Sequence, residues 1–222
     1  MSVLSLEEAG DGVVVIRWDD HENRFNLGSL SEWHAALDDL EQREGPLALV
    51  VTGSGKFFSN GLDLDRFSEA PDEAGAIVDG VHRLLGRLLV FPAWTVMAIN
   101  GHAFAAGAML SATADVRLMR TGRGYWCLPE VDLGLPLTPP MTAAVTARLP
   151  ATAAAEAMLT ARRYGAEEAL DRGIVTAVHA EDELLQSAVS EAASMAAKDR
   201  SVIADHKQQL FGRAAAICLE NQ

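Results

Sequence analysis

Short apolar runs and stretches of helical periodicity follow one another along the chain. Runs at 3–6 and 13–18 predict two strands, and the Gly- and Asp-containing segment 9–12 between them is typical of a hairpin turn. Apolar residues then recur at helical spacing, with acids between them, which predicts a helix over 31–42. The apolar run 47–51 predicts the next strand.

The middle of the chain repeats this order of strand, loop and helix. A helix is expected over 73–91, where Pro92 ends it. A strand over 96–99 leads through small residues into a short helix that begins near Ala106. Strand-like pieces at 116–119 and 125–128 precede Pro129 and Glu130.

After Pro139 the pattern is mostly helical. Alanine-rich helical segments run to Arg148 and over 151–160, a strand is expected at 174–178, and two terminal helices are expected over 182–197 and 201–219. Strands that alternate with helices indicate an α/β fold with crossover connections and a helical C-terminal end. We expect a core over residues 1–180 that carries the active site, followed by a helical C-terminal region over 181–222.

Composition narrows the class of protein. The chain has 222 residues, of which 49% are hydrophobic and 22% charged, so it is long and apolar enough for one large globular domain, or a domain with a small appendage. No apolar run reaches the roughly 18 residues of a membrane span, and the N-terminus lacks the features of a signal peptide, so a cytoplasmic protein is expected. Cys127 and Cys218 are interpreted as reduced core residues. The net charge of −13 argues against nucleic acid or an anionic membrane as a partner.

Two loops carry the clearest chemical signal. The segments 57–64 and 100–109 each follow an apolar run and pass through small residues into a helix, which would aim helix N-terminal N–H groups outward. Two such groups that face each other would form an oxyanion hole for a carbonyl oxygen that gains negative charge. The alternatives are a tight turn at Asn60-Gly61 and close helix packing at the small residues 105–108.

Glu130 is the candidate general base. It follows Pro129 and precedes Val131 in an apolar neighbourhood, where desolvation raises the pKa of a carboxyl group. The alternative is an exposed loop acid beside Asp132. His102 is interpreted as a structural histidine bonded to a backbone carbonyl. The acids at 63, 65 and 69 are explained by the helix dipole, so no metal is assigned.

Four ordered motifs together resemble the crotonase family, also called the enoyl-CoA hydratase/isomerase superfamily. They lie at 21–26, 58–64, 100–107 and 128–134, and the resemblance covers nearly the whole chain. It implies a spiral of ββα turns, with the acyl thioester oxygen between the N–H groups of Leu62 and Ala106. It also implies a homotrimer or a dimer of trimers, and no separate cofactor, because coenzyme A is part of the substrate. The residues implied to bind coenzyme A or the acyl group are Asn23, Arg24, Phe25, Asn60, Gly61, Asp63, Leu64 and Met109.

The chain departs from the family's hydratases at one position. Hydratases carry two glutamates, whereas here Met109 occupies the first position and only Glu130 remains. Hydration needs a group that activates water as well as a proton donor, and a thioether can do neither. The pattern is most similar to 3,2-trans-enoyl-CoA isomerases of fatty acid β-oxidation, which need one base. The alternatives are another one-carboxylate chemistry, such as thioester hydrolysis or decarboxylation, and a catalytically silent acyl-CoA-binding scaffold. The chain also ends near Leu219, without the further helices of family hydratases, so altered trimer contacts and an altered lid over the acyl pocket are expected.

Overall fold

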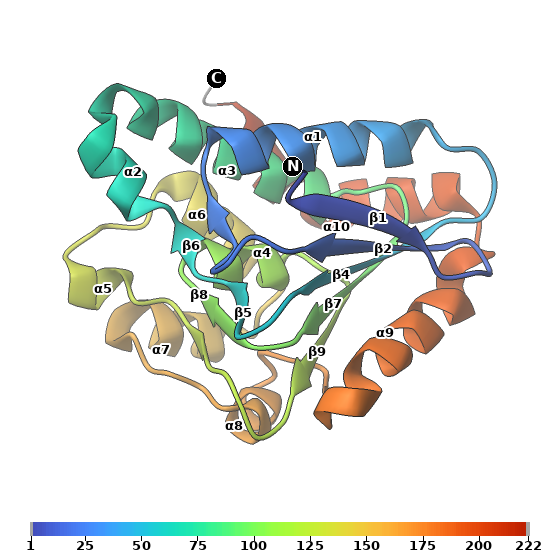
Figure 1. Cartoon of the computed structure of the whole chain (residues 1–222). Helices are drawn as coiled ribbons and strands as arrows, with labels where there is room; N and C mark the ends of the chain where they lie inside the picture. The colour runs from blue at the N-terminus through green and yellow to red at the C-terminus, as the bar shows by residue number, and fades with distance from the viewer. Residues whose placement is uncertain (1, 221–222) are drawn as a thin grey trace.

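A mixed six-stranded sheet organises the computed structural model, which describes residues 2–220 (Figure 1). Its strand order is β1-β2-β4-β7-β9-β11, with only the β1–β2 pair antiparallel. The parallel register aligns Val15, Val50, Val96 and Val116 on successive strands. The bounds are β1 Leu4–Glu8, β2 Val13–Trp18, β4 Ala48–Gly53, β7 Trp94–Ile99, β9 Val116–Arg120 and β11 Ala177–His179.

Helices cover both faces of this sheet, which confirms the predicted α/β class. Figure 1 shows α9 (Glu181–Ala196) on one side and α1 (Leu27–Gln42), α3 (Ala74–Leu89) and α10 (Arg200–Leu219) on the other. Alternate strand residues supply the two apolar layers because successive side chains of a strand point to opposite faces. On the α9 side, Val50 and Val96 pack with Ala188 and Ala192, which lie four residues apart on one helix face.

Two smaller sheets extend the fold beside the large one. In the first, β8 (His102–Phe104) lies between β10 (Trp126–Cys127) and β5 (Phe57–Ser59). In the second, β3 (Arg24–Phe25) pairs in parallel with β6 (Gly61–Leu62). The remaining helices are α2 Leu64–Glu69, the 3₁₀ turn η1 Pro71–Glu73, α4 Ala106–Ala112, α5 Glu130–Leu133, α6 Pro139–Thr146, α7 Ala151–Thr160 and α8 Ala166–Asp171.

Two predicted elements begin three or more residues away from their observed starts. The first helix begins at Leu27 rather than residue 31, because the Asn26 side chain accepts a hydrogen bond from Ser29 N and Ser29 Oγ accepts one from Asn26 N. The strand predicted at 174–178 lies at Ala177–His179, because the N–H groups of Ile174 and Val175 donate to Ala169 O and close a turn after α8.

Cys127 and Cys218 are both buried, as predicted. Over the residues that the structure describes, no helix combines the length and hydropathy that a membrane crossing requires.

Candidate active site

The two predicted loops pack directly against each other. Gly61 has φ +87°, and a Cβ added there would lie 2.8 Å from Ala105 Cβ and 3.3 Å from Ala106 N. Gly107 fits equally closely, because its added Cβ would lie 2.5 Å from Ser59 O. Neither position therefore has room for a side chain. The close-packing interpretation of these small residues is correct, and that packing brings Gly61 against the backbone of Ala106.

The backbone N–H groups at the contact between the two loops differ in their hydrogen-bond partners. Ala106 is the first residue of α4, where an N–H has no partner within its helix. Ala105 before it has φ 49°, an uncommon conformation for a non-glycine residue. On the other loop, Gly61 N donates to Ser59 Oγ at 3.2 Å and Asp63 N to Phe25 O at 3.0 Å, on either side of Leu62.

Leu62, Ala106 and Glu130 line one cavity of about 530 Å³. Most of its wall is apolar, and Met109 contributes to it from α4 with a side chain that is almost fully buried. Figure 1 shows α2 and α5, which both border this cavity, at the same side of the molecule. The structure thus brings together the three residues predicted to be catalytic, although they lie on three separate segments of the chain.

Glu130 is the buried acid of this cavity, so the alternative of an exposed loop acid is wrong. It is the first residue of α5 after Pro129 and is 9% exposed. Its Oε2 has no hydrogen-bond partner among the described residues. Burial raises the pKa of Glu130 to about 7, because a carboxylate loses hydration there. A base with that pKa can hold and release a proton near neutral pH.

The residues predicted to bind coenzyme A fall into two groups. Arg24, Asn60, Leu64 and Met109 line the cavity. Asn23, Phe25, Gly61 and Asp63 are not among the lining residues, and Asn23 and Phe25 are fully buried.

The buried members of the second group have structural contacts. The Asn23 amide donates to Trp18 O, Phe57 O and Phe58 O, and Phe25 packs against the Trp18 ring. Gly61 lies at the contact between the two loops, and Asp63 caps α2 by accepting from Arg66 N at 3.4 Å.

His102 has a structural role, but its hydrogen-bond partner differs from the predicted backbone carbonyl. Its Nδ1 accepts a hydrogen bond from the N–H of Tyr125, rather than donating to a carbonyl. The ring packs among Phe57, Phe104 and Tyr125. Burial, with a smaller effect of Lys56, lowers the pKa of His102, which favours the neutral imidazole that this bond requires.

Sequence reasoning missed most of the apolar cavity wall and two polar residues in it, Asp65 and Thr138. Thr138 lines the cavity, caps α6 through Met141 N at 3.3 Å and contacts His82 Nε2 at 2.8 Å. A Thr directly before Pro139 is a helix-start signal, so this residue could have been located from the sequence. The apolar residues come from five different segments and have no shared pattern; they are Phe67, Val78, Phe104, Leu133, Leu135 and Met141.

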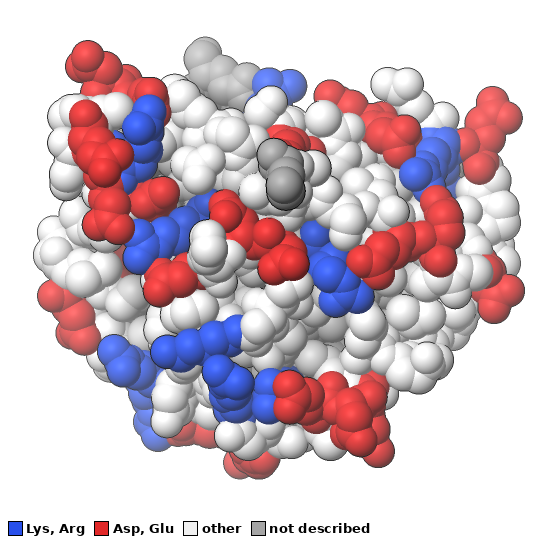
Figure 2. All heavy atoms as spheres, viewed as in Figure 1, with Lys and Arg blue, Asp and Glu red and all other residues white. Residues whose placement is uncertain are grey.

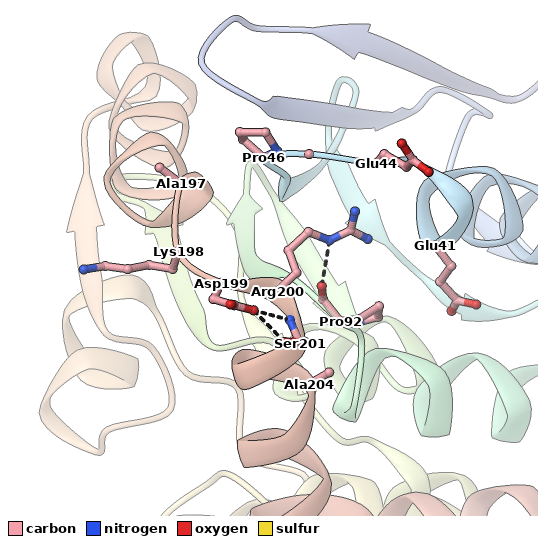
Figure 3. A pocket seen from close by; sticks show the side chains of 11 residues that line it. Glu41, Glu44, Pro46, Pro92, Ala197, Lys198, Asp199, Arg200, Ser201 and Ala204 are labelled. Carbon is pink, nitrogen blue, oxygen red and sulfur yellow. Dashed lines mark hydrogen bonds between the residues drawn. The ribbon is translucent and has the colours of Figure 1, made fainter.

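A second cavity, of about 510 Å³, lies where the end of α1 meets the start of α10 (Figure 3). Two of its charged residues, Asp199 and Arg200, are engaged in holding the start of α10. Arg200 Nε donates to Pro92 O at 3.1 Å, and other Arg200 nitrogens donate to the carbonyls of Arg43 and Leu40. Asp199 accepts from Ser201 N at 2.9 Å. We therefore place the chemistry in the cavity that contains Glu130.

Comparisons with known proteins place relatives of the chain among enoyl-CoA isomerases and hydratases. The chain is 32% identical over 97% of its length to enoyl-CoA delta isomerase 2, peroxisomal, of Arabidopsis thaliana, of which 95% is covered. It is 34% identical over 88% of its length to enoyl-CoA delta isomerase 3 of the same plant, of which 86% is covered. The crystal structure of human mitochondrial delta3-delta2-enoyl-CoA isomerase superimposes with a TM-score of 0.89 at 26% identity, covering 97% of this chain and 85% of that one.

A probable enoyl-CoA hydratase of Mycobacterium tuberculosis superimposes with a TM-score of 0.90 at 26% identity, covering 98% of this chain and 92% of that one. The predicted crotonase-like fold is therefore confirmed. Residues 8–217 match the enoyl-CoA hydratase/isomerase family along almost the whole chain, so the protein belongs to that family.

Proposed function

We propose that the protein is an isomerase that converts a 3-enoyl-CoA into the 2-trans-enoyl-CoA in fatty acid β-oxidation. The observation that carries this proposal is that the cavity contains a single buried carboxylate. Glu130 is its one buried carboxylate among the described residues, and Met109 stands on the wall near the two loops. Moving a double bond requires one base that takes a proton at C2 and returns it at C4. The enoyl-CoA delta isomerases among the relatives support the same reaction.

The proposed mechanism begins at Glu130. Its carboxylate removes a proton from C2, the electron pair of the C–H bond enters the conjugated system, and negative charge develops on the thioester oxygen. The N–H groups of Leu62 and Ala106 donate hydrogen bonds to that oxygen and stabilise the dienolate. The protonated Glu130 then delivers its proton to C4. No bond to the sulfur is broken, so coenzyme A stays attached throughout.

Assembly is part of the proposal, as a homotrimer or a dimer of trimers. Exposed apolar side chains on α5 and α7 support it, since Val131, Leu133 and Leu159 are the kind of residues that subunit interfaces bury.

Substitution of Ala106 by Pro tests the backbone donors, which side-chain deletion cannot reach. Proline has no N–H but is tolerated at the first residue of a helix. We expect kcat to fall about 10²–10³-fold, the loss typical of one oxyanion-hole donor. The matched control is Ala166→Pro, at the first residue of α8 outside the cavity lining. An unchanged kcat in a variant with the wild-type circular dichroism spectrum would place the second donor elsewhere.

Hydration of crotonyl-CoA tests the assignment of a single base. Because Met109 cannot activate water, we expect hydration by the wild-type protein to be far slower than isomerisation of a 3-enoyl-CoA. Met109→Glu is expected to introduce weak hydration, at a cost in stability from the added buried charge. The measurement follows loss of the conjugated enoyl-thioester absorbance. Wild-type hydration as fast as isomerisation would refute the proposed function, and release of free thiol would indicate thioester hydrolysis instead.

A further inference from the structure

The part of the cavity opening that is formed by Arg24 and α2 is acidic. Arg24 is the only Lys or Arg among the described residues that line the cavity. Its guanidinium contacts Glu22 at 2.7 Å, Asp65 at 2.6 Å and Asp63 at 3.4 Å. The neighbouring Arg66 is paired with Glu73 at 2.9 Å and Glu69 at 3.6 Å. Figure 2 shows acidic side chains gathered over α2, with basic side chains between them. Two arginines therefore face five carboxylates.

Asp65 differs from the other two acids on Arg24. The Asp65 side chain is 80% exposed and lines the cavity. Asp63, in contrast, caps α2, and Glu22 accepts a second hydrogen bond from the Asn60 amide at 2.8 Å. Asp65 is thus free to leave Arg24 without disturbing a buried contact. While it stays, it occupies the guanidinium edge that another anion would use.

We propose that Asp65 sets the preference of this site among acyl carriers, by competing for Arg24 with the phosphates of a phosphate-bearing carrier. This inference rests on the proposed function for the identity of both the acyl group and its coenzyme A carrier. A coenzyme A ester brings several phosphate charges to this acidic part of the opening, whereas the corresponding pantetheine ester has the same thioester arm and no phosphate. With Asp65 on Arg24, the protein should bind coenzyme A esters more tightly than pantetheine esters by only a small factor. That factor would be larger if Arg24 had no acidic partner.

The contacts of Arg24 indicate that Asp65 competes with a phosphate for Arg24 and does not help the phosphate to bind. The Asp65 hydrogen bond is the largest cause of a raised pKa of Arg24, so the guanidinium is already stabilised by an anion. A phosphate that binds Arg24 must displace Asp65 or lie beside it. In the second case the like charges repel, and one charge pair a few ångströms apart in water is worth about 1 kcal/mol, or about five-fold in affinity.

The test is the binding of free coenzyme A and of pantetheine, measured by isothermal titration calorimetry for wild type, Asp65→Asn and Glu69→Gln. We expect Asp65→Asn to bind coenzyme A about five-fold more tightly than wild type does, with a much smaller change for pantetheine. Glu69→Gln makes the same change in net charge on the same helix, but its carboxylate contacts Arg66 rather than Arg24, so little change is expected. Equal effects of the two variants, or an unchanged coenzyme A affinity in Asp65→Asn, would overturn the inference.

Turnover separates this inference from the proposed function. With 3-enoyl esters of both carriers, Asp65→Asn should lower KM for the coenzyme A ester and leave kcat nearly unchanged. Failure of the wild type to isomerise either ester would refute the proposed function, while the calorimetric comparison would still decide the role of Asp65. Turnover of both esters with no KM change in Asp65→Asn would refute the role of Asp65 alone.

Discussion

Glu130→Gln is expected to lower the rate of isomerisation about 10²–10⁴-fold, the usual loss when a general base is removed. Gln has nearly the shape of Glu but cannot accept the C2 proton. The affinity for a coenzyme A ester should change little, because the cavity wall is otherwise intact. Steady-state kinetics with a 3-enoyl-CoA, together with calorimetric binding of a saturated acyl-CoA, measures both quantities.

The pH profile provides an independent readout of the same residue. The base must be deprotonated to act, and the pKa of Glu130 is raised to about 7. In the free wild-type enzyme, kcat/KM should therefore rise with pH up to about 7 and level off above it. Asp132→Asn is the matched control, because Asp132 is an exposed acid on the same short helix. A Glu130→Gln variant within a few-fold of wild type, or a wild-type profile that is flat between pH 5 and 8, would exclude Glu130 as the base.

Asp115→Ala is expected to lower the free energy of unfolding by about 3–5 kcal/mol, because it leaves buried cations without their counter-ion. The Asp115 carboxylate bonds Arg148 at 2.8 Å and Lys207 at 2.6 Å, and all three side chains are less than 10% exposed. It also accepts from the N–H and hydroxyl groups of Thr95. One carboxylate thus joins β7, the end of α6 and helix α10.

Chemical denaturation followed by circular dichroism measures this loss. Lys207 additionally donates to Ala93 O at 2.6 Å. Burial lowers the pKa of Lys207 to about 8 even though Asp115 raises it, so removal of Asp115 lowers this pKa further, and deprotonation of Lys207 relieves part of the cost. The control is Asp205→Ala. Asp205 is an exposed acid on α10, the helix that carries Lys207, and its removal is expected to change the free energy of unfolding by no more than about 0.5 kcal/mol. A similar small change for Asp115→Ala would show that the ion pairs add nothing to stability.

The predictable part of the fold is the part with strong local periodicity. The strands β2, β4 and β7 lie close to their predicted positions because each contains a continuous apolar run. Strands β1 and β9 also lie close to their predicted positions, although polar residues interrupt their apolar ones. Helices α5 and α8 were not predicted, since elements of four to six residues are too short to show a period. The helix after segment 57–64 was expected, but without bounds, and it is α2.

The motifs of the candidate site could be predicted from the sequence, but the contacts and burial of their side chains could not. Loop composition indicated that Gly61 and Ala106 would approach a common point, and the structure places them in contact. The acid pairing of Arg24 was not predictable, because Asp65 lies 41 positions away along the chain. The burial of Asn23 also depends on contacts with Phe57 and Phe58 that no local pattern shows.

The most direct test of the proposed one-base isomerisation uses a 3-hexenoyl-CoA that carries deuterium at both C2 positions, incubated with the wild-type protein in ordinary water. The reaction is followed by the conjugated enoyl-thioester absorbance, and the product is examined by mass spectrometry and NMR. A single glutamate in an apolar cavity should move the label, so we predict rising absorbance and 2-trans-hexenoyl-CoA with deuterium at C4. Absence of conjugation, release of free thiol, or complete loss of the transferred deuterium to water would contradict the account.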